Sequence, residues 1–267
     1  MHWRYVARKD FEDAVRSRLF WALSGLMILL AYIAMAAPRA IDSTISVEAG
    51  ISIVSGSMLL FIPVIAIVAG YMAIVSERQT GSIRMVLSLP LTRGEVLVGK
   101  FVGRTVVVIV PILLGFGLAI PFVFAVYGSF DLPAYAEFVF RAVLTAFVYV
   151  GIAVGVSGSV ATRGKALAAV ITLFIIFEWM WFTVVLGIYY LLNFELPSFG
   201  DEPTWFEAMQ GIAPGEAITR LADGLFSGIS TDAPLLVQEW VSLFVVGMWI
   251  ALPLAVGYWR FTRANIS

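Results

Sequence analysis

The sequence contains no cysteine and only one histidine, His2. The absence of cysteine excludes disulfides, thiolate metal sites and cysteine nucleophiles. Copper and zinc sites need clustered imidazole, thiolate or thioether ligands, and one histidine supplies no such cluster. We therefore expect His2 to be solvated, and we expect no metal, cofactor or catalytic residue in this chain.

Charge is also scarce. Only 13% of the 267 residues are charged and 61% are hydrophobic, whereas a soluble domain carries about 25% charged residues. So few charged side chains are not enough to cover a protein surface exposed to water. We therefore expect lipid to cover much of the surface of this protein. The net charge of −1 gives no reason to expect a nucleic-acid partner.

Long apolar runs are what the sequence has instead. A bilayer core of about 30 Å takes about 20 apolar residues per helix. The runs predict an all-α polytopic membrane protein with six transmembrane helices, in one transmembrane domain over residues 1–267. The six segments lie at about 19–37, 51–75, 104–127, 138–161, 166–192 and 236–258.

The distribution of basic residues predicts the orientation. With the N-terminus in the cytoplasm, 14 of the 17 Lys and Arg residues fall in cytoplasmic segments, as the positive-inside rule requires. Both termini are therefore expected in the cytoplasm of a cell-membrane protein. The outer segments carry twelve carboxylates, which indicates either a cationic ligand or a high-salt habitat.

Two segments outside the spans are amphipathic. Residues 3–18 place Trp3, Ala7 and Phe11 at helical spacing among arginines, which predicts an N-terminal helix at the inner membrane interface. The outer stretch 193–235 contains Pro214, which suits a first helical position, followed by apolar residues at helical spacing. This pattern predicts an extracytoplasmic amphipathic helix.

The inner loop 76–104 is patterned as a helical elbow. Pro90 disfavours helix at the residue before it, and Thr92 with Glu95 forms a capping box that opens the next helix. The loop is expected to contain a helix, a tight Leu-Pro-Leu turn and a second helix that enters the third span. Such an elbow either docks a partner or is a well-capped connector.

The elbow also contains a false phosphate-binding motif. The run from Gly94 to Lys100 matches part of a P-loop, but Phe101 stands where that motif needs Ser or Thr for magnesium, and no strand precedes it. We therefore expect no nucleotide to bind there.

Some residues inside the predicted spans allow two interpretations of their role. Glu178 is the only carboxylate deep in a predicted span, where a charge costs at least about 2.5 kcal/mol. It either lines a pathway or makes a structural hydrogen bond in the helix bundle. The small-residue pairs Gly99/Gly103 and Gly151/Gly155 allow close helix approach, within one subunit or between two.

The elbow resembles a known family. Its motifs are similar to those of the ABC type-2 permeases, the membrane halves of ABC exporters whose ATPase is a separate polypeptide, and within them to the NosY-like branch, which is associated with maturation of a copper enzyme. The residues that carry the resemblance are Glu77, Gly81, Ser82, Ile83, Leu87, Ser88, Pro90, Leu91, Thr92, Arg93, Gly99, Lys100 and Gly103.

The resemblance implies a specific mechanism. Two permease copies would form the translocation path as a homodimer, and two ABC ATPase subunits, which hold ATP and Mg²⁺, would bind below them. The elbow would dock into each ATPase. Its ATPase-coupling residues would be Glu77, Gly81, Ser82, Leu89, Pro90, Leu91, Thr92 and Arg93.

Two other functions stay open on the sequence, and an intramembrane enzyme is not expected. The chain could be a scaffold that transmits ATPase strokes to an extracytoplasmic protein without passing cargo, and the long outer segment favours that alternative. A secondary transporter would need coupling-ion sites or inverted repeats, and neither is evident. An intramembrane protease would need a constellation such as H-E-x-x-H, which is absent from the sequence.

Overall fold

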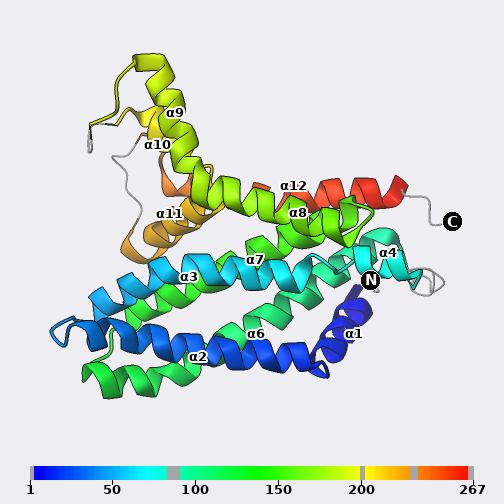
Figure 1. Cartoon of the computed structure of the whole chain (residues 1–267), viewed down its shortest axis with the longest axis horizontal. Coiled ribbons are helices and arrows are strands. Elements are labelled where there is room, and N and C mark those ends of the chain that lie inside the picture. The colour runs from blue at the N-terminus through cyan, green and yellow to red at the C-terminus, as the bar shows by residue number, and fades with distance from the viewer. Residues whose placement is uncertain (1–2, 83–90, 199–201, 229–233, 264–267) are drawn as a thin grey trace.

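The computed structural model in Figure 1 describes residues 3–82, 91–198, 202–228 and 234–263. In these residues all regular structure is helical, and six helical segments are long and apolar enough to cross a membrane. The predicted all-α polytopic fold is therefore confirmed. The helices are α1 (Trp3–Val15), α2 (Arg18–Ile41), α3 (Val47–Gly70), α4 (Val75–Thr80), α6 (Arg93–Tyr127), α7 (Leu132–Ser159), α8 (Arg163–Phe174), the π-helix η1 (Ile175–Met180), α9 (Trp181–Asn193), α10 (Thr204–Gln210), α11 (Pro214–Ser227) and α12 (Glu239–Arg263).

Polar residues at the helix N-termini set where several long helices begin. The side chains of Ser17, Ser46, Asp131 and Thr162 each accept a hydrogen bond from a backbone N–H three residues later. Such caps satisfy N–H groups that have no partner inside the helix. The long helix α6 ends at Gly128, whose φ of 70° suits glycine.

The helix α7 lies at the centre of the bundle. It packs against α3, α6, α11 and α12, while α2 packs on the outer side of α6. Consecutive residues of α7 from Val148 to Val154 are almost completely buried, so α7 is surrounded by protein. The lipid-facing surface belongs to the peripheral helices, which expose large apolar side chains such as Leu29 and Leu118.

Two spans differ from simple straight helices. The third begins at Arg93, ahead of the expected residue 104, because the second helix of the elbow continues into it without a break. The fifth consists of α8, η1 and α9, and the chain turns at Met180, which has φ −98° and ψ −15°. A short π-helix of this kind interrupts the regular hydrogen-bond ladder and is a common site of bending.

Beyond the bend, α9 rises away from the other long helices, with α10 beside it (Figure 1). Half of the large apolar side chains of α9 are exposed, including Phe182, Leu191 and Leu192. Aromatic contacts join the two helices: Tyr189 stacks on Trp205 with ring centroids 5.8 Å apart. The sequence predicted a fifth span over 166–192, but hydropathy alone contains no signal for this change of direction.

Both small-residue pairs lie at helix crossings within this chain. A Cβ at Gly99 would lie 2.5 Å from Cβ of Val6 on α1, and a Cβ at Gly155 would overlap the carbonyl of Pro253 on α12. Close approach of this kind is what small residues at a helix interface permit. Packing within one subunit is therefore the role that the structure gives to these glycines.

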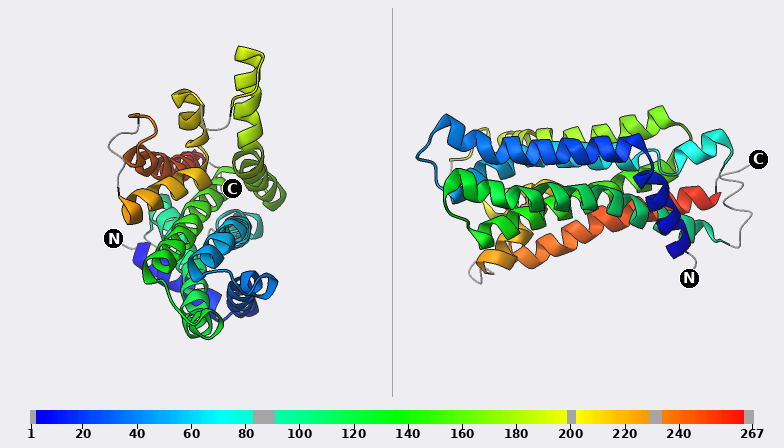
Figure 2. Two further views of the ribbon diagram at one scale, coloured as in Figure 1. Left: turned by 90° about the vertical axis from the view of Figure 1, so that its left-hand side faces the viewer. Right: turned by 90° about the horizontal axis from the view of Figure 1, so that it is seen from below.

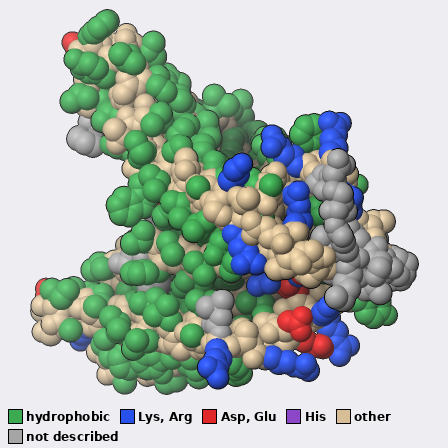
Figure 3. Space-filling view, turned by 45° about the vertical axis from the view of Figure 1, so that its right-hand side comes forward, with side chains coloured by type: hydrophobic (Ala, Val, Ile, Leu, Met, Phe, Trp, Pro, Cys, Tyr) green, Lys and Arg blue, Asp and Glu red, His purple; other side chains and the backbone are tan. Residues whose placement is uncertain are grey.

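The two ends of the bundle differ in charge. The end that contains α1, α4 and the last turn of α12 is called the termini end here, and the end that contains the α2–α3 and α6–α7 connections is called the far end (Figure 2). Lys and Arg side chains gather at the termini end, whereas apolar side chains cover most of the remaining visible surface (Figure 3).

Candidate functional site

The first helix of the elbow, α4, is fixed to the inner part of the bundle. The hydroxyl oxygen of Ser157, on α7, accepts hydrogen bonds from the backbone N–H groups of Ile74 and Val75, each at 3.0 Å. At the other end of the contact, Arg78 donates to the carbonyl of Val160 at 3.0 Å. Ser157 is completely buried, so it caps α4 from a different element where α4 has no local side-chain cap.

Four charged residues, Asp10, Glu77, Lys100 and Arg104, form what we call the termini-end cluster. Lys100 Nζ lies 2.8 Å from Asp10 Oδ1 and 2.6 Å from Glu77 Oε1, and Arg104 Nε lies 2.8 Å from Asp10 Oδ2. Asp10 and Lys100 are buried. The cluster joins α1, α4 and α6, and an unpaired charge at such a depth is strongly destabilising.

Glycines bring α1 close enough for this cluster to form. At Gly103 a Cβ would lie 2.9 Å from Cβ of Asp10 and 3.1 Å from the carbonyl oxygen of Ala7. The fully buried residues of α1 are Val6, Ala7 and Asp10, whereas Phe11 of the expected apolar stripe is half-buried. The amphipathic helix predicted for residues 3–18 therefore exists as α1, but it packs across α6 with a buried carboxylate at the centre of its contact face.

The second helix of the elbow is capped as the sequence predicts. Thr92 Oγ1 accepts from the Glu95 N–H at 3.2 Å, and Glu95 Oε2 accepts from the Thr92 N–H at 3.1 Å. Its first residue, Arg93, donates to the carbonyls of Phe261 and Thr262 at the end of α12. The capping box is confirmed, and the same turn is joined to the C-terminal end of the last span.

The predicted coupling residues lie in different environments. Glu77, Thr92 and Arg93 are engaged in the contacts just described. Gly81 ends α4 with φ 74° and is exposed, Ser82 follows it, and Leu91 is half-buried against the core. Leu89 and Pro90, with the expected apolar stripe at Ile83, Val86 and Leu87, lie outside the described residues.

Sequence reasoning did not find Asp10, Arg104 or Ser157, and it named Lys100 only as part of a motif. A lysine inside a helix, between Gly99 and apolar residues, is the one signal that could have indicated a buried partner. The partners themselves come from segments up to about ninety residues away, and no local pattern identifies them.

A second site, in the middle of the bundle at the N-terminus of α11 (Figure 1), consists of Tyr149, Glu178 and Gly215; we call it the far-end hub because α11 extends from it toward the far end. Oε1 of Glu178 accepts from the Tyr149 hydroxyl at 2.5 Å and from the Gly215 backbone N–H at 2.9 Å. Glu178 lies in the π-helix η1. Since Ala213 provides no side-chain cap to α11, Glu178 caps that helix from the fifth span by accepting from a first-turn N–H group, which has no partner inside the helix.

The hub needs a glycine in α11. A Cβ at Gly215 would overlap Oε2 of Glu178, so a larger residue excludes this contact. Two tryptophans support the turn that precedes α11: Trp181 donates to the carbonyl of Met209 at 2.7 Å and Trp249 to that of Ile212 at 2.8 Å. The structural hydrogen bond that the sequence offered as one alternative for Glu178 is present.

One more polar contact fixes α11 at the far end. Arg141, on α7, forms ion pairs with Glu137 at 2.5 Å and with Asp223 on α11. The amphipathic helix predicted from Pro214 onward is confirmed as α11, with Ile218 and Ala222 fully buried. Hydrogen bonds at its first turn and an ion pair near its last turn therefore connect α11 to the spans.

The fold and the termini-end elbow define a class of protein: a six-span, multi-pass membrane subunit of an ABC transporter. The family model described as "ABC-2 family transporter protein" matches residues 4–266, and the chain belongs to that family. As a permease subunit it is not itself an enzyme, and the family implies an ABC ATPase as its partner.

Two similar proteins are both named "Probable ABC transporter permease protein NosY". The relative from Stutzerimonas stutzeri is 29% identical over 275 residues, which cover 97% of this chain and 97% of the relative. The relative from Pseudomonas aeruginosa is 29% identical over 191 residues, which cover 68% of this chain and 69% of the relative. The similarity to the first relative extends over nearly the whole chain, elbow and outer helices included.

Proposed function

We propose that this chain is the permease subunit of an ABC exporter and works as a homodimer in the cell membrane. The whole chain, residues 1–267, forms one permease domain whose termini end faces the cytoplasm. ATP and Mg²⁺ bind to the separate ATPase subunit. The distribution of Lys and Arg supports this orientation, because 14 of 17 fall in the segments assigned to the cytoplasm.

One observation carries the proposal: the elbow is attached to several spans at once. Ser157 and Arg78 fix α4 to α7, the termini-end cluster fixes it to α1 and α6, and Arg93 fixes the next turn to α12. A displacement of the elbow by an ATPase therefore moves buried helices instead of bending a loose loop. Glu77 and Arg93 act in this mechanism as positioning residues.

The docking contact itself is assigned to the elbow: to its surface at Gly81 and Ser82 and, from the resemblance in sequence, to the Leu89–Pro90 pair. ATP-driven closure of the ATPase dimer would push on this surface and change the balance between inward-open and outward-open states. Such a shift requires that the ATP-bound ATPase has different affinities for the two states. The elbow provides the connection through which that difference acts on the spans.

The test uses the permease reconstituted in vesicles with its ATPase subunit. Replacing Leu89 and Pro90 together by Ala is expected to leave basal ATP hydrolysis in place and to reduce transport per ATP several-fold. The matched control is another Leu-Pro pair, Leu196 and Pro197, replaced in the same way at the opposite side of the membrane. Unchanged coupling in the elbow variant would contradict the docking assignment.

A second function is favoured by the far-end hub. Because Glu178 attaches the bent fifth span to α11, movement of that span also moves an extracytoplasmic helix. The subunit would then transmit ATPase strokes to an extracytoplasmic protein. Glu178→Gln distinguishes the two functions: a changed cargo-stimulated ATP hydrolysis supports a pathway role, whereas unchanged hydrolysis with impaired maturation of an outer partner supports mechanical transmission.

A further inference from the structure

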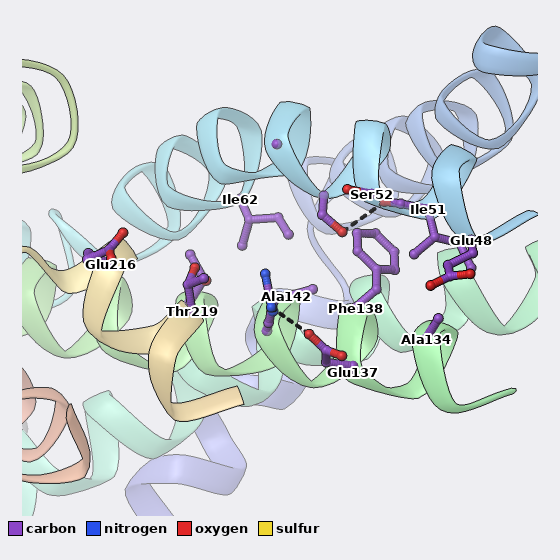
Figure 4. A pocket seen from close by; sticks show the side chains of 14 residues that line it. Glu48, Ile51, Ser52, Ile62, Ala134, Glu137, Phe138, Ala142, Glu216 and Thr219 are labelled. Carbon is purple, nitrogen blue, oxygen red and sulfur yellow. Dashed lines mark hydrogen bonds and ion pairs between the residues drawn. The ribbon is translucent and has the colours of Figure 1, made fainter. Parts of the chain in front are cut away.

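A cavity of about 410 Å³ opens at the far end of the bundle between α3, α7 and α11 (Figure 4). Neither the hub nor the termini-end cluster lies in it. Its volume falls in the range of small-molecule sites, about 300–1,000 Å³. Three helices that belong to different parts of the chain form its walls, so the cavity is a product of the tertiary fold.

The charges around the cavity are predominantly negative. Glu48, Glu137 and Glu216 line it together with Arg141. Arg141 forms ion pairs with both Glu137 and Asp223, and Glu216 forms an ion pair with Arg220 at 2.9 Å. The lining itself therefore contains three carboxylates and one guanidinium group. Glu48, on the first turn of α3, makes no ion pair with any residue that the structure describes, so its charge is available to a ligand.

A buried hydroxyl provides independent evidence that the cavity accepts a polar ligand. Thr145 lines the cavity and is only 2% exposed. No hydrogen bond joins its hydroxyl group to another described residue, and the hydroxyl is not among the completely sealed polar atoms that lack a partner, so it is accessible from the cavity. A ligand atom that donates or accepts a hydrogen bond at this position would satisfy it.

The remaining walls indicate which kind of cation fits. No group of three or more His, Cys, Asp or Glu side chains in the described residues is placed to hold a metal ion. Ile51, Ile62 and Phe138 provide apolar surface next to the carboxylates. A ligand with one positive group and an apolar or aromatic part matches both kinds of wall, whereas a small inorganic cation matches only one.

We propose that this cavity binds an organic cation of small-molecule size. The positive group lies beside Glu48, a polar atom reaches Thr145, and the apolar part rests on Phe138. The inference rests on the proposed transport function in one respect. If the chain is a transporter, organic cations are its class of cargo, and the cavity binds them in the outer half of the transport path. Binding itself is measured without ATP or transport, so the two proposals fail separately.

The experiment measures binding of ethidium, an aromatic organic cation, to the full-length permease in a neutral detergent. Fluorescence titration is expected to give saturable binding that weakens with increasing salt. Glu48→Gln is expected to reduce the affinity about fivefold, the effect of one partly exposed charge pair. The matched control Glu195→Gln removes the same charge from the outer surface away from the cavity and is expected to leave the affinity unchanged.

A second variant tests the hydroxyl. Thr145→Val keeps the shape of the side chain, so the thermal stability of the permease is expected to be unchanged or slightly higher. Ethidium affinity is expected to fall about threefold to tenfold, the effect of one hydrogen bond. Loss of affinity without loss of stability is a result that a purely structural role does not produce.

Several outcomes would overturn the proposal. They are the absence of saturable binding, equal effects of Glu48→Gln and Glu195→Gln, or displacement of ethidium by equimolar Ca²⁺ or Mg²⁺, which would assign the cavity to inorganic cations. Copurification with the ATPase subunit is measured on the same preparations. Binding without copurification would contradict the transport function alone, and copurification without binding would contradict the cation site alone.

Discussion

The two ends of this membrane protein are held together by different chemistry. At the termini end, buried ion pairs of Lys100 and Arg104 with Asp10 and Glu77 join three helices. At the far end, one carboxylate of Glu178 accepts two hydrogen bonds, and it does so from a π-helix. The first arrangement has several mutually dependent charges, whereas the second depends on a single acceptor.

This difference matches the different tasks proposed for the two ends. The charges of the termini-end cluster depend on one another, so the three helices that they join are expected to move as one rigid unit. Such a unit is suited to an elbow that an ATPase displaces. A hub with one acceptor next to a bend has no network of charges around it, and its separation costs about 1–3 kcal/mol for each buried polar group left without a partner. The hub therefore contains fewer mutually dependent charges than the termini-end cluster, and the predictions below test that contrast.

The largest effect is expected from Lys100→Met. The substitution leaves Asp10 buried beside Arg104 alone and Glu77 without its cationic partner, and removal of one member of a buried ion pair costs about 3–5 kcal/mol. The free energy of unfolding, measured by SDS titration in mixed micelles, is expected to fall by that amount.

The control for this prediction lies on α1, the helix that carries Asp10. Arg8 and Glu12 form an ion pair on α1 at 2.7 Å, with both side chains exposed. Arg8→Ala is expected to produce no measurable change in the same titration, because exposed pairs contribute little. An equal loss from both variants would show that the cluster is no more rigid than an exposed pair.

A smaller effect is expected at the far end from Gly215→Ala. The new methyl group overlaps Glu178 Oε2, so the carboxylate has to withdraw from α11, and overpacking of this kind costs about 1–3 kcal/mol. The same titration measures the loss.

Gly187→Ala on α9 is the matched control for the far end. A Cβ there meets nothing within 4 Å, and Ala is favoured over Gly in a helix by about 0.5–1 kcal/mol. The control is therefore expected to be neutral or stabilising. If Gly215→Ala were equally well tolerated, the close contact between η1 and α11 would not contribute to stability.

The contrast also explains what could be predicted from the sequence. The six spans and the capping box of Thr92 and Glu95 depend on local patterns, namely apolar length and a four-residue motif, and both were predicted. The pairing of Asp10 with Lys100 joins residues far apart in the chain. Apolar patterning records that a segment is buried but contains no information about which distant polar side chain it meets.

The far end was less predictable for the same reason. Glu178 was identified as unusual because a carboxylate inside a span is rare, yet its partners Tyr149 and Gly215 come from two other helices. The π-helix that presents it has no strong sequence signature, since Ile175–Met180 is as apolar as a regular span apart from Glu178 itself. The bend at Met180 was missed because hydropathy measures composition and not hydrogen-bond register.

The smallest effect is expected at the cap of α6, which completes the comparison of local and distant caps. Thr92 caps its own helix, whereas α11 is capped by Glu178 from another span. Thr92→Ala removes one acceptor and is expected to cost about 1 kcal/mol, measured by the same SDS titration. Thr92→Ser keeps the hydroxyl and is the control, expected within about 0.5 kcal/mol of the parent. Because a local cap stabilises only the helix that carries it, Thr92→Ala is expected to leave ethidium affinity unchanged, and a parallel loss of affinity would mean that the two ends of the bundle are coupled more tightly than their contacts indicate.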